Sequence, residues 1–287
     1  MADTTPLIRI ADMSMLVTGG AAVLAIVVVL SVRRRWADAA RLPRPTDNNV
    51  EAIDLLIGLA ALLFLPGVFK RFLDLMAGTI PTTQPEAEAL PTPQAAMANI
   101  AGQIGATAVL ILLGRLRFAG GLAGWGLRLA GWPRQLLTAV IAYVAIWPLC
   151  SGLLELTVFG IRLVFRNYTP PEHNTIRLLQ AGNEPRWLCG MIIVSALILA
   201  PVVEELFFRG LLQSAVAKWS GSQWRSVIFC GCAFGLFHFS VEQTIPALAL
   251  LGIVLGYCYA RTRSLTLVIF LHAVFNGKTL LWLMLSQ

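Results

Sequence analysis

The sequence predicts an all-α polytopic membrane protein with about eight transmembrane helices. Of its 287 residues, 57% are hydrophobic and only 13% are charged, whereas soluble domains carry roughly 25% charged residues. The mean hydropathy is +0.74. The apolar residues also form long unbroken runs, of about the 20 residues that a helix needs to cross a bilayer.

Eight apolar runs are candidate spans. They cover residues 14–32, 51–69, 97–114, 136–165, 187–207, 226–240, 244–260 and 265–285. Only Arg261, Thr262 and Arg263 separate the last two runs, which predicts a tight hairpin. The run at 136–165 is longer than one span needs and contains Pro148, so part of it could bend or lie along the interface.

The charges at the ends of these runs predict the topology. Asp3 and Asp12 precede the first run and Arg33–Arg35 follow it, which is the reverse of a cleaved secretory signal. If the N-terminus lies outside, the inner loops hold thirteen basic residues and the outer segments hold seven. This bias favours a multi-pass protein with both termini outside, in the cytoplasmic membrane if the cell is bacterial.

The net charge of +7 does not indicate nucleic-acid binding, because the basic residues gather just beyond the apolar runs. That distribution is typical of topology signals and of contact with the anionic lipids of a bilayer. The five cysteines lie within or beside apolar runs and form no zinc-type or redox spacing, so we expect no disulfide framework.

Three features between and within the spans predict local structure. The Pro- and Thr-rich stretch 79–96 is expected to be an extended outer loop. Gly and Trp alternate with Arg in 115–134, which predicts an interfacial segment with Trp125 and Trp132 at headgroup level. Gly252 and Gly256 would allow their span to approach a neighbouring helix closely.

The stretch from Pro201 to Gly210 places two acids and one base in apolar surroundings, which at membrane depth is by default a functional site. Glu205 and Arg209 are four residues apart, the favourable spacing for a pair on one helix face. Glu204 lies about 100° around the helix and is left free for chemistry. Pro201 is expected to kink this helix.

Three more polar residues fall in C-terminal spans. His238 ends the sixth span, and His272 and Asn276 are four residues apart on one face of the eighth. Singly, each has a structural explanation, such as a histidine bonded to a carbonyl or an asparagine that joins two helices. Together with Glu204 they predict a shared polar cavity in the C-terminal bundle, because separate burial of each would be costly.

A glutamate with two histidines is suited to activating water, and an asparagine can donate to an oxyanion. A covalent nucleophile is disfavoured, because no Ser or Cys stands beside a His with an orienting acid. The His-Glu-x-x-His zinc motif is also absent.

Three motifs follow one another on the C-terminal helices: Glu204-Glu205-x-x-x-Arg209, Phe234-x-x-x-His238 and His272-x-x-x-Asn276. In this order they resemble the motifs of the CPBP family of intramembrane proteases, also called the ABI family, which includes CAAX prenyl endopeptidase-like enzymes. The resemblance covers about residues 187–280. It predicts two regions: accessory spans in 1–186, with the outer loop at 79–96, and a catalytic domain in 187–287. It implies a peptide or lipid-modified protein as substrate.

The resemblance also implies a role for each residue. Glu204 would activate water as the general base, and His238 would help to hold that water. His272 and Asn276 would stabilise the oxyanion, with Glu205 and Arg209 as a supporting pair. Family members are described both as metalloendopeptidases and as metal-free enzymes. Glu204, His238 and His272 could complete a zinc (Zn2+) site, but Glu204 would then be a ligand, which favours a metal-free mechanism.

Two other functions fit some of these residues. A non-catalytic immunity or regulatory protein could bind a peptide in the same cavity. A transporter could use the buried Glu and His as a proton relay, although no internal repeat is visible. One expectation conflicts with a shared site: the predicted spans place Glu204 near the inner end of 187–207 and His238 near the outer end of 226–240. A broken or tilted helix lining a cavity would bring them together.

Overall fold

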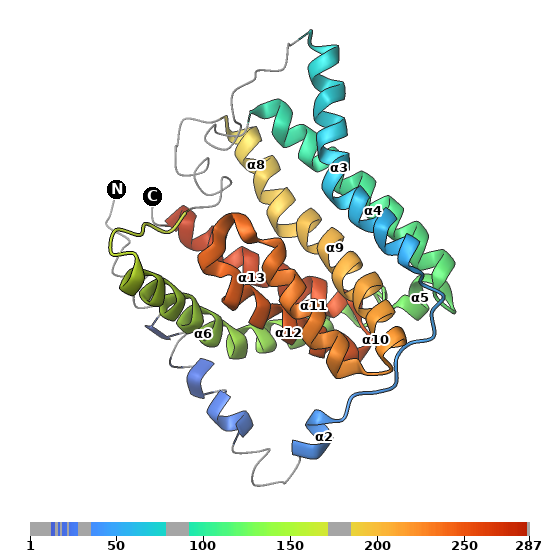
Figure 1. The fold of residues 1–287 in the computed structure, drawn as a ribbon, viewed down its shortest axis with the longest axis vertical. Helices are drawn as coiled ribbons and strands as arrows, with labels where there is room; N and C mark the ends of the chain where they lie inside the picture. The colour runs from blue at the N-terminus through green and yellow to red at the C-terminus, as the bar shows by residue number, and fades with distance from the viewer. Residues whose placement is uncertain are drawn as a thin grey trace.

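The structure, a computed structural model, describes residues 36–78, 92–171 and 185–285 and part of 13–27. These residues are almost entirely helical, and the one isolated β-bridge among them joins Asn48 to Phe118. The all-α membrane fold predicted from the sequence is therefore confirmed (Figure 1). The predicted span at 14–32 lies largely outside the described residues.

The helices described between residues 36 and 171 come first. They are α2 (Trp36–Ala40), α3 (Ala52–Met76), α4 (Pro93–Arg117), α5 (Gly121–Trp125) and α6 (Trp132–Val164). The C-terminal part supplies α8 (Arg186–Val194), η1 (Ser195–Leu199), α9 (Ala200–Glu205), η2 (Leu206–Gln213), α10 (Ser214–Ser220), α11 (Gln223–Phe237), η3 (Phe239–Thr244), α12 (Ile245–Thr262) and α13 (Leu265–Leu285).

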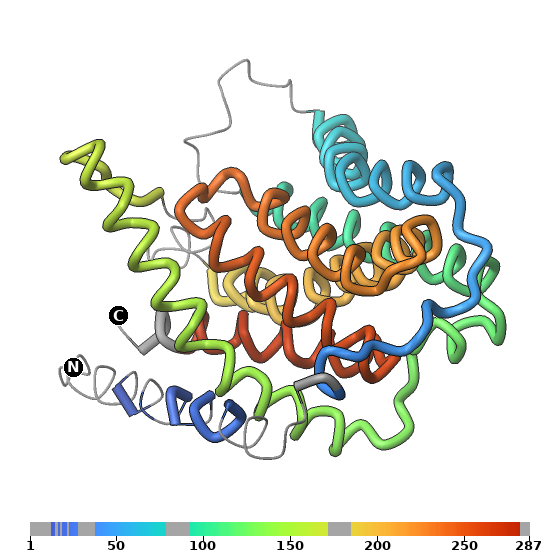
Figure 2. The backbone as a smooth tube through the Cα atoms, turned by 60° about the horizontal axis from the view of Figure 1, so that its bottom comes forward, coloured from blue at the N-terminus to red at the C-terminus, as the bar shows by residue number. Residues whose placement is uncertain are grey.

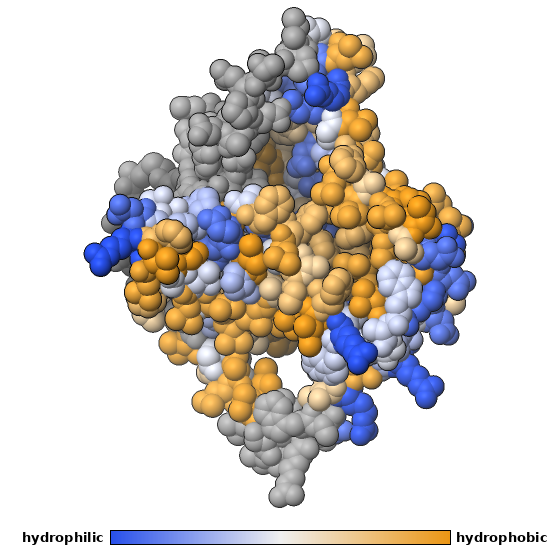
Figure 3. Space-filling model, viewed as in Figure 1, coloured by the Kyte–Doolittle hydropathy of each residue, from blue (hydrophilic) through white to orange (hydrophobic). Residues whose placement is uncertain are grey.

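Within the described residues, five helices are long and apolar enough to cross a membrane. They are 52–76, 93–117, 132–164, 186–220 and 239–262, and the shorter apolar helix Leu265–Leu281 accompanies them. Large apolar side chains are exposed along them, and much of the surface in Figure 3 is accordingly hydrophobic. The count of eight spans stays a prediction.

Two of the predicted boundaries were wrong. The span predicted at 187–207 is part of one continuous helical rod, 186–220, with π-helical turns at η1 and η2 on either side of α9. The loop predicted at 79–96 ends earlier, because α4 starts at Pro93. Thr92 caps that helix by accepting a hydrogen bond from the Ala95 N–H (3.2 Å), and Pro93 suits the first helical position. Residues 79–91 lie outside the described residues.

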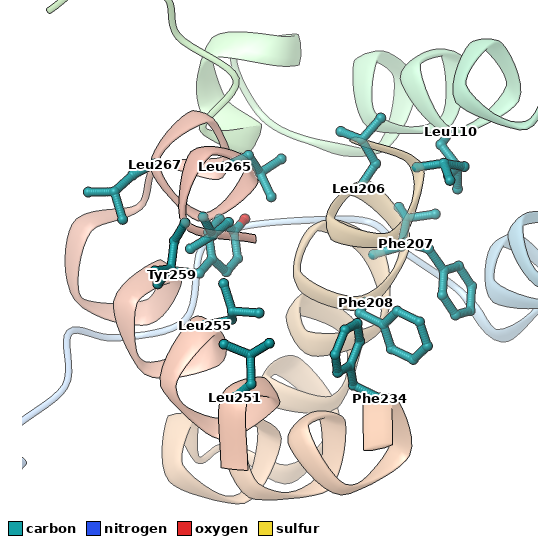
Figure 4. Packing of buried hydrophobic residues seen from close by; sticks show 14 of the residues in the cluster. Leu110, Leu206, Phe207, Phe208, Phe234, Leu251, Leu255, Tyr259, Leu265 and Leu267 are labelled. Atoms are coloured by element: carbon teal, nitrogen blue, oxygen red, sulfur yellow. The ribbon is translucent and has the colours of Figure 1, made fainter. Parts of the chain in front are cut away.

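The rod 186–220 runs through the centre of the bundle. Helices α3 and α4 pack together on one side of it, while α11, α12 and α13 pack on the other, with α6 beside α13 (Figures 1 and 2). One hydrophobic core joins both parts of the chain, since it includes Leu110 of α4 and Phe207 and Phe208 of η2 together with Leu251 and Leu255 of α12 (Figure 4). The functional division at residue 186 stays a prediction.

Trp125 is a correction to the sequence interpretation. It was expected at headgroup level, but it is fully buried, whereas Trp132 is exposed. Its ring packs against Gly114 and Gly210, where any added Cβ would collide with it. The cause is local: Gly120 and Gly126 flank α5 with positive φ values of 78° and 96°, which fold this segment back onto the bundle.

The segment between α2 and α3 ties the ends of the C-terminal helices together. The carbonyl of Ala40 accepts a hydrogen bond from Trp224 Nε1 (2.7 Å), and that of Arg41 accepts one from Arg261 Nη1 (2.8 Å). The Val50 carbonyl accepts one from Lys218 Nζ (3.2 Å). These bonds connect the ends of α10, α11 and α12 through one shared segment.

Helices α11 and α12 cross at paired glycines, which is the close approach predicted for Gly252. A Cβ at Gly252 would lie 2.7 Å from the carbonyl oxygen of Gly231 and 2.9 Å from its Cα. Neither backbone can move without separating the two helices, and α11 ends at the polar residues of the cavity.

We expect Gly252→Val to lower the free energy of unfolding by about 1–3 kcal/mol, because the added side chain overpacks this crossing. The matched control is Gly152→Ala in α6, where an added Cβ meets no atom within 4 Å. Thermal unfolding in detergent measures both variants. A Gly252→Val protein as stable as the control would contradict the packing described above.

Candidate active site

The two adjacent glutamates of α9 point to different surroundings. Glu205 is fully buried, and Arg209 Nη1 lies 2.9 Å from its Oε1 atom. The Arg209 guanidinium also donates to the carbonyl of Gly252 (3.3 Å) and lies 4.4 Å from the ring centroid of Phe234. Glu204 lies in the wall of the cavity instead, and its Oε2 atom has no hydrogen-bond partner. The geometry therefore separates a structural carboxylate from a free one.

His272 of α13 lies between these two carboxylates. Its Nδ1 atom lies 2.8 Å from Glu205 Oε1, and its Nε2 atom lies 4.0 Å from Glu204 Oε2. Because a carboxylate can only accept, Nδ1 carries the proton and donates to Glu205. Phe234 packs edge-on against the imidazole, with ring centroids 5.5 Å apart. The ring is thereby fixed with Nε2 directed toward Glu204.

His238 follows the last residue of α11. Its Nδ1 atom lies 2.9 Å from the carbonyl oxygen of Phe234, one turn earlier. The carbonyl can only accept, so Nδ1 is protonated and, in the neutral ring, Nε2 is left as an acceptor. The ring also lies beside that of Phe234, with centroids 5.0 Å apart.

The expected difference in depth between Glu204 and His238 was wrong, because both line one cavity. Glu204 lies sixteen residues before the end of the rod at Ser220, which is about 24 Å of helix. His238 lies fifteen residues after α11 begins at Gln223, about 22 Å on the way back. The two side chains therefore reach the same level. The error came from ending the rod at residue 207.

Asn276 lies one turn beyond His272 on α13. Its Nδ2 atom donates to the carbonyl oxygen of Ala196 (3.0 Å), in the π-helical turn η1. An amide nitrogen carries two N–H groups, so a second donor is left for another partner. Thus η1 supplies a carbonyl that orients Asn276. Pro201 lies in the first turn of α9, directly after η1.

Glu204, His238, His272 and Asn276 all line one cavity of about 860 Å³. Within the part of the chain that the structure describes, Glu204 is the sole carboxylate in its wall, since Glu205 is shut away in the core. The remaining wall is mostly apolar and comes from α4, α8, η1, η3, α12, α13 and the residues that follow α6. Its larger apolar members are Ile100, Pro170, Pro171, Met191, Ile192, Val241, Leu248 and Leu280.

Sequence reasoning missed two polar groups of this cavity. Asn99 and Gln103 of α4 reach Ser195 of η1, and both lie in the wall. Their spacing of four within an apolar span was a signal that could have been used. The other group is Gln243, which donates to the carbonyl of Pro171 (2.8 Å) and accepts from Tyr168 (3.2 Å). Nothing in its local sequence indicated this contact.

The candidate zinc ligands do not form a metal site as they are placed. Among the described residues, no group of three His, Cys, Asp or Glu side chains is arranged to hold a metal ion. The hydrogen bonds at Nδ1 of His272 and His238 do not decide this, because metal-ligating histidines are often held in the same way and both Nε2 atoms stay available. On the arrangement of these side chains, we derive no step that passes through a metal.

The comparisons with known proteins bear on the same part of the chain. No curated protein and no solved structure gives a match. A family model described as "Type II CAAX prenyl endopeptidase Rce1-like" matches residues 185–277, which contain all six predicted site residues. This confirms the resemblance that the three motifs indicated. Residues 185–277 are thus similar to Rce1-like type II CAAX prenyl endopeptidases, in line with the resemblance to the CPBP family.

Proposed function

We propose that the protein is an intramembrane endopeptidase that hydrolyses a peptide bond with a water molecule activated by Glu204. The observation that carries this proposal is that the two adjacent carboxylates have different surroundings. Glu205 is buried in the core, where Arg209 and His272 bind its Oε1 atom, whereas Glu204 lies in the wall of a large cavity and, among the described residues, has no such cationic partner within hydrogen-bond distance. The family that residues 185–277 resemble supports the same reaction class.

Glu204 acts as the general base in this proposal. Its carboxylate takes a proton from water, the resulting hydroxide attacks the carbonyl carbon, and the C–N bond breaks as Glu204 returns the proton to the leaving amine. His238 holds the attacking water. Its Nδ1–H is bound to a carbonyl, so its Nε2 can accept a hydrogen bond from that water.

His272 and Asn276 stabilise the oxyanion of the tetrahedral intermediate. In its protonated form, His272 can donate through Nε2 while Nδ1–H stays bound to Glu205, whose negative charge stabilises the imidazolium. Asn276 offers the N–H that is not used by Ala196. Both side chains are held in place by these hydrogen bonds before substrate arrives, which is the preorganisation that electrostatic catalysis requires.

The substrate class follows from the family and from the lining of the cavity. The Rce1-like family implies a prenylated peptide or protein. The mostly apolar wall suits a hydrophobic or lipid-modified peptide tail, with a small number of polar groups that orient it. No step in this proposal needs a metal ion.

Replacing the proposed base should abolish turnover without unfolding the protein. We expect Glu204→Gln to lower kcat by about 10²–10⁴-fold, because the amide cannot accept a proton. Stability should change by less than about 0.5 kcal/mol, since the pair of Glu205 and Arg209 is untouched. Purified protein, a library of hydrophobic and prenylated peptides and mass spectrometry of the products measure the activity.

Wild-type protein treated with a metal chelator is the companion sample. Unchanged cleavage is expected, and loss of cleavage after chelation would assign a metal to the reaction. Equal product patterns from wild type and Glu204→Gln would remove Glu204 from its proposed role. Binding of a peptide without any cleavage would favour a binding protein over an enzyme.

Glu205→Gln should lower stability as well as activity, unlike Glu204→Gln. It leaves the Arg209 cation buried without its partner, so we expect a loss of about 3–5 kcal/mol in the free energy of unfolding. The double variant Glu205→Gln/Arg209→Met should recover much of this loss, because no uncompensated charge remains. It should stay inactive, since His272 has lost its anionic partner.

Thermal unfolding in detergent, run beside Glu204→Gln, gives the comparison. If the two glutamate variants unfold at the same temperature, the buried pair does not have the structural role described here.

A further inference from the structure

Helix α4 places a polar group in the cavity wall outside the region that the family model matches. Asn99 Nδ2 donates to Ser195 Oγ (3.3 Å), and Ser195 Oγ donates to Gln103 Oε1 (2.9 Å). All three residues line the cavity. Around them the wall is apolar and includes Ala96 and Ile100 of the same helix.

This group is only half satisfied. Within the described residues, Asn99 Oδ1 and Gln103 Nε2 make no hydrogen bond, although each amide uses its other atom on Ser195. One unused acceptor and one unused donor therefore stand one helical turn apart on the cavity side of α4. Asn99 is exposed and Gln103 is half-buried, so these atoms are accessible to a molecule bound in the cavity.

We propose that Asn99 and Gln103 form a subsite that binds the main chain of a peptide substrate. A peptide unit in extended conformation offers an N–H and a C=O, which are the partners that Asn99 Oδ1 and Gln103 Nε2 lack. An apolar wall with isolated amide groups can bind peptides of varied side chains through their backbone. This assignment rests on the proposed function and gives it a second contact region.

The position of Asn99, Gln103 and Ser195 along the rod sets the distance between this subsite and the peptide bond that is cleaved at Glu204. Ser195 lies nine residues before Glu204 on the same helical rod, which corresponds to about 13 Å. An extended peptide advances about 3.3 Å per residue. The subsite therefore contacts main-chain atoms about four residues away from the bond at Glu204.

The alternative is that Asn99, Gln103 and Ser195 simply join α4 to the rod, as polar residues commonly do between membrane helices. Such a structural role would lower stability without changing how the enzyme treats different peptides. A substrate role makes the effect of substitution depend on the peptide. This difference decides between them.

The experiment compares Asn99→Leu and Gln103→Met with the control Ile104→Met, all in the full-length protein in detergent. Ile104 neighbours Gln103 on α4 but is exposed outside the cavity wall. The probe is the library peptide that wild type cleaves fastest, together with analogues in which one backbone amide at a time is N-methylated. We expect each cavity variant to raise KM by about 3- to 10-fold, with kcat within about twofold of wild type. The control should match wild type.

The N-methyl series is the sharper readout. In wild type, one methylated amide about four residues from the cleaved bond should weaken cleavage strongly. That penalty should vanish in Asn99→Leu, since the acceptor for this N–H is gone. Unchanged KM in both cavity variants, or the same N-methyl profile in variant and wild type, would overturn the subsite while leaving the protease intact. If wild type cleaves no peptide, the proposed function fails and the subsite falls with it.

Discussion

The buried ion pair between Glu205 and Arg209 is the interaction on which the rest of the site depends. Neither side chain is exposed, so each charge is tolerable only because the other lies 2.9 Å away. The same carboxylate fixes the tautomer of His272, and the same guanidinium binds a carbonyl of α12 and stacks on Phe234 of α11. A single pair thus joins the rod to α11, α12 and α13, and it orients the ring that faces Glu204.

The sequence was sufficient to predict this pair and four polar residues of the cavity, because helical spacing acts within one element. Four residues separate Glu205 from Arg209, and four separate His272 from Asn276, so each set shares a face whatever the tertiary structure. Contacts between elements were less accessible. That Glu205 also holds His272, and that Asn276 binds the carbonyl of Ala196, depends on how α13 packs against the rod.

Two of the errors share a physical origin: polar and aromatic residues were interpreted without their partners. The span was predicted to end at 207, but the helix continues to Ser220, and its polar residues Gln213 and Lys218 donate to the carbonyls of Gly256 and Val50. Trp125 was placed at the interface because Trp is frequent there. Gly114 and Gly210 instead leave a space in the core that its ring fills, and Gly210 is distant in sequence.

The cavity also shows why a family match over one part of the chain does not describe the whole site. The catalytic candidates all come from 185–277, where motif spacing and family agree. One wall of the cavity, however, belongs to α4, and the residues after α6 contact η3 through Gln243. The catalytic candidates are positioned by contacts within the C-terminal bundle. Other polar groups of the same cavity come from α4, whose sequence carries no motif, so the wall of the cavity combines both parts of the chain.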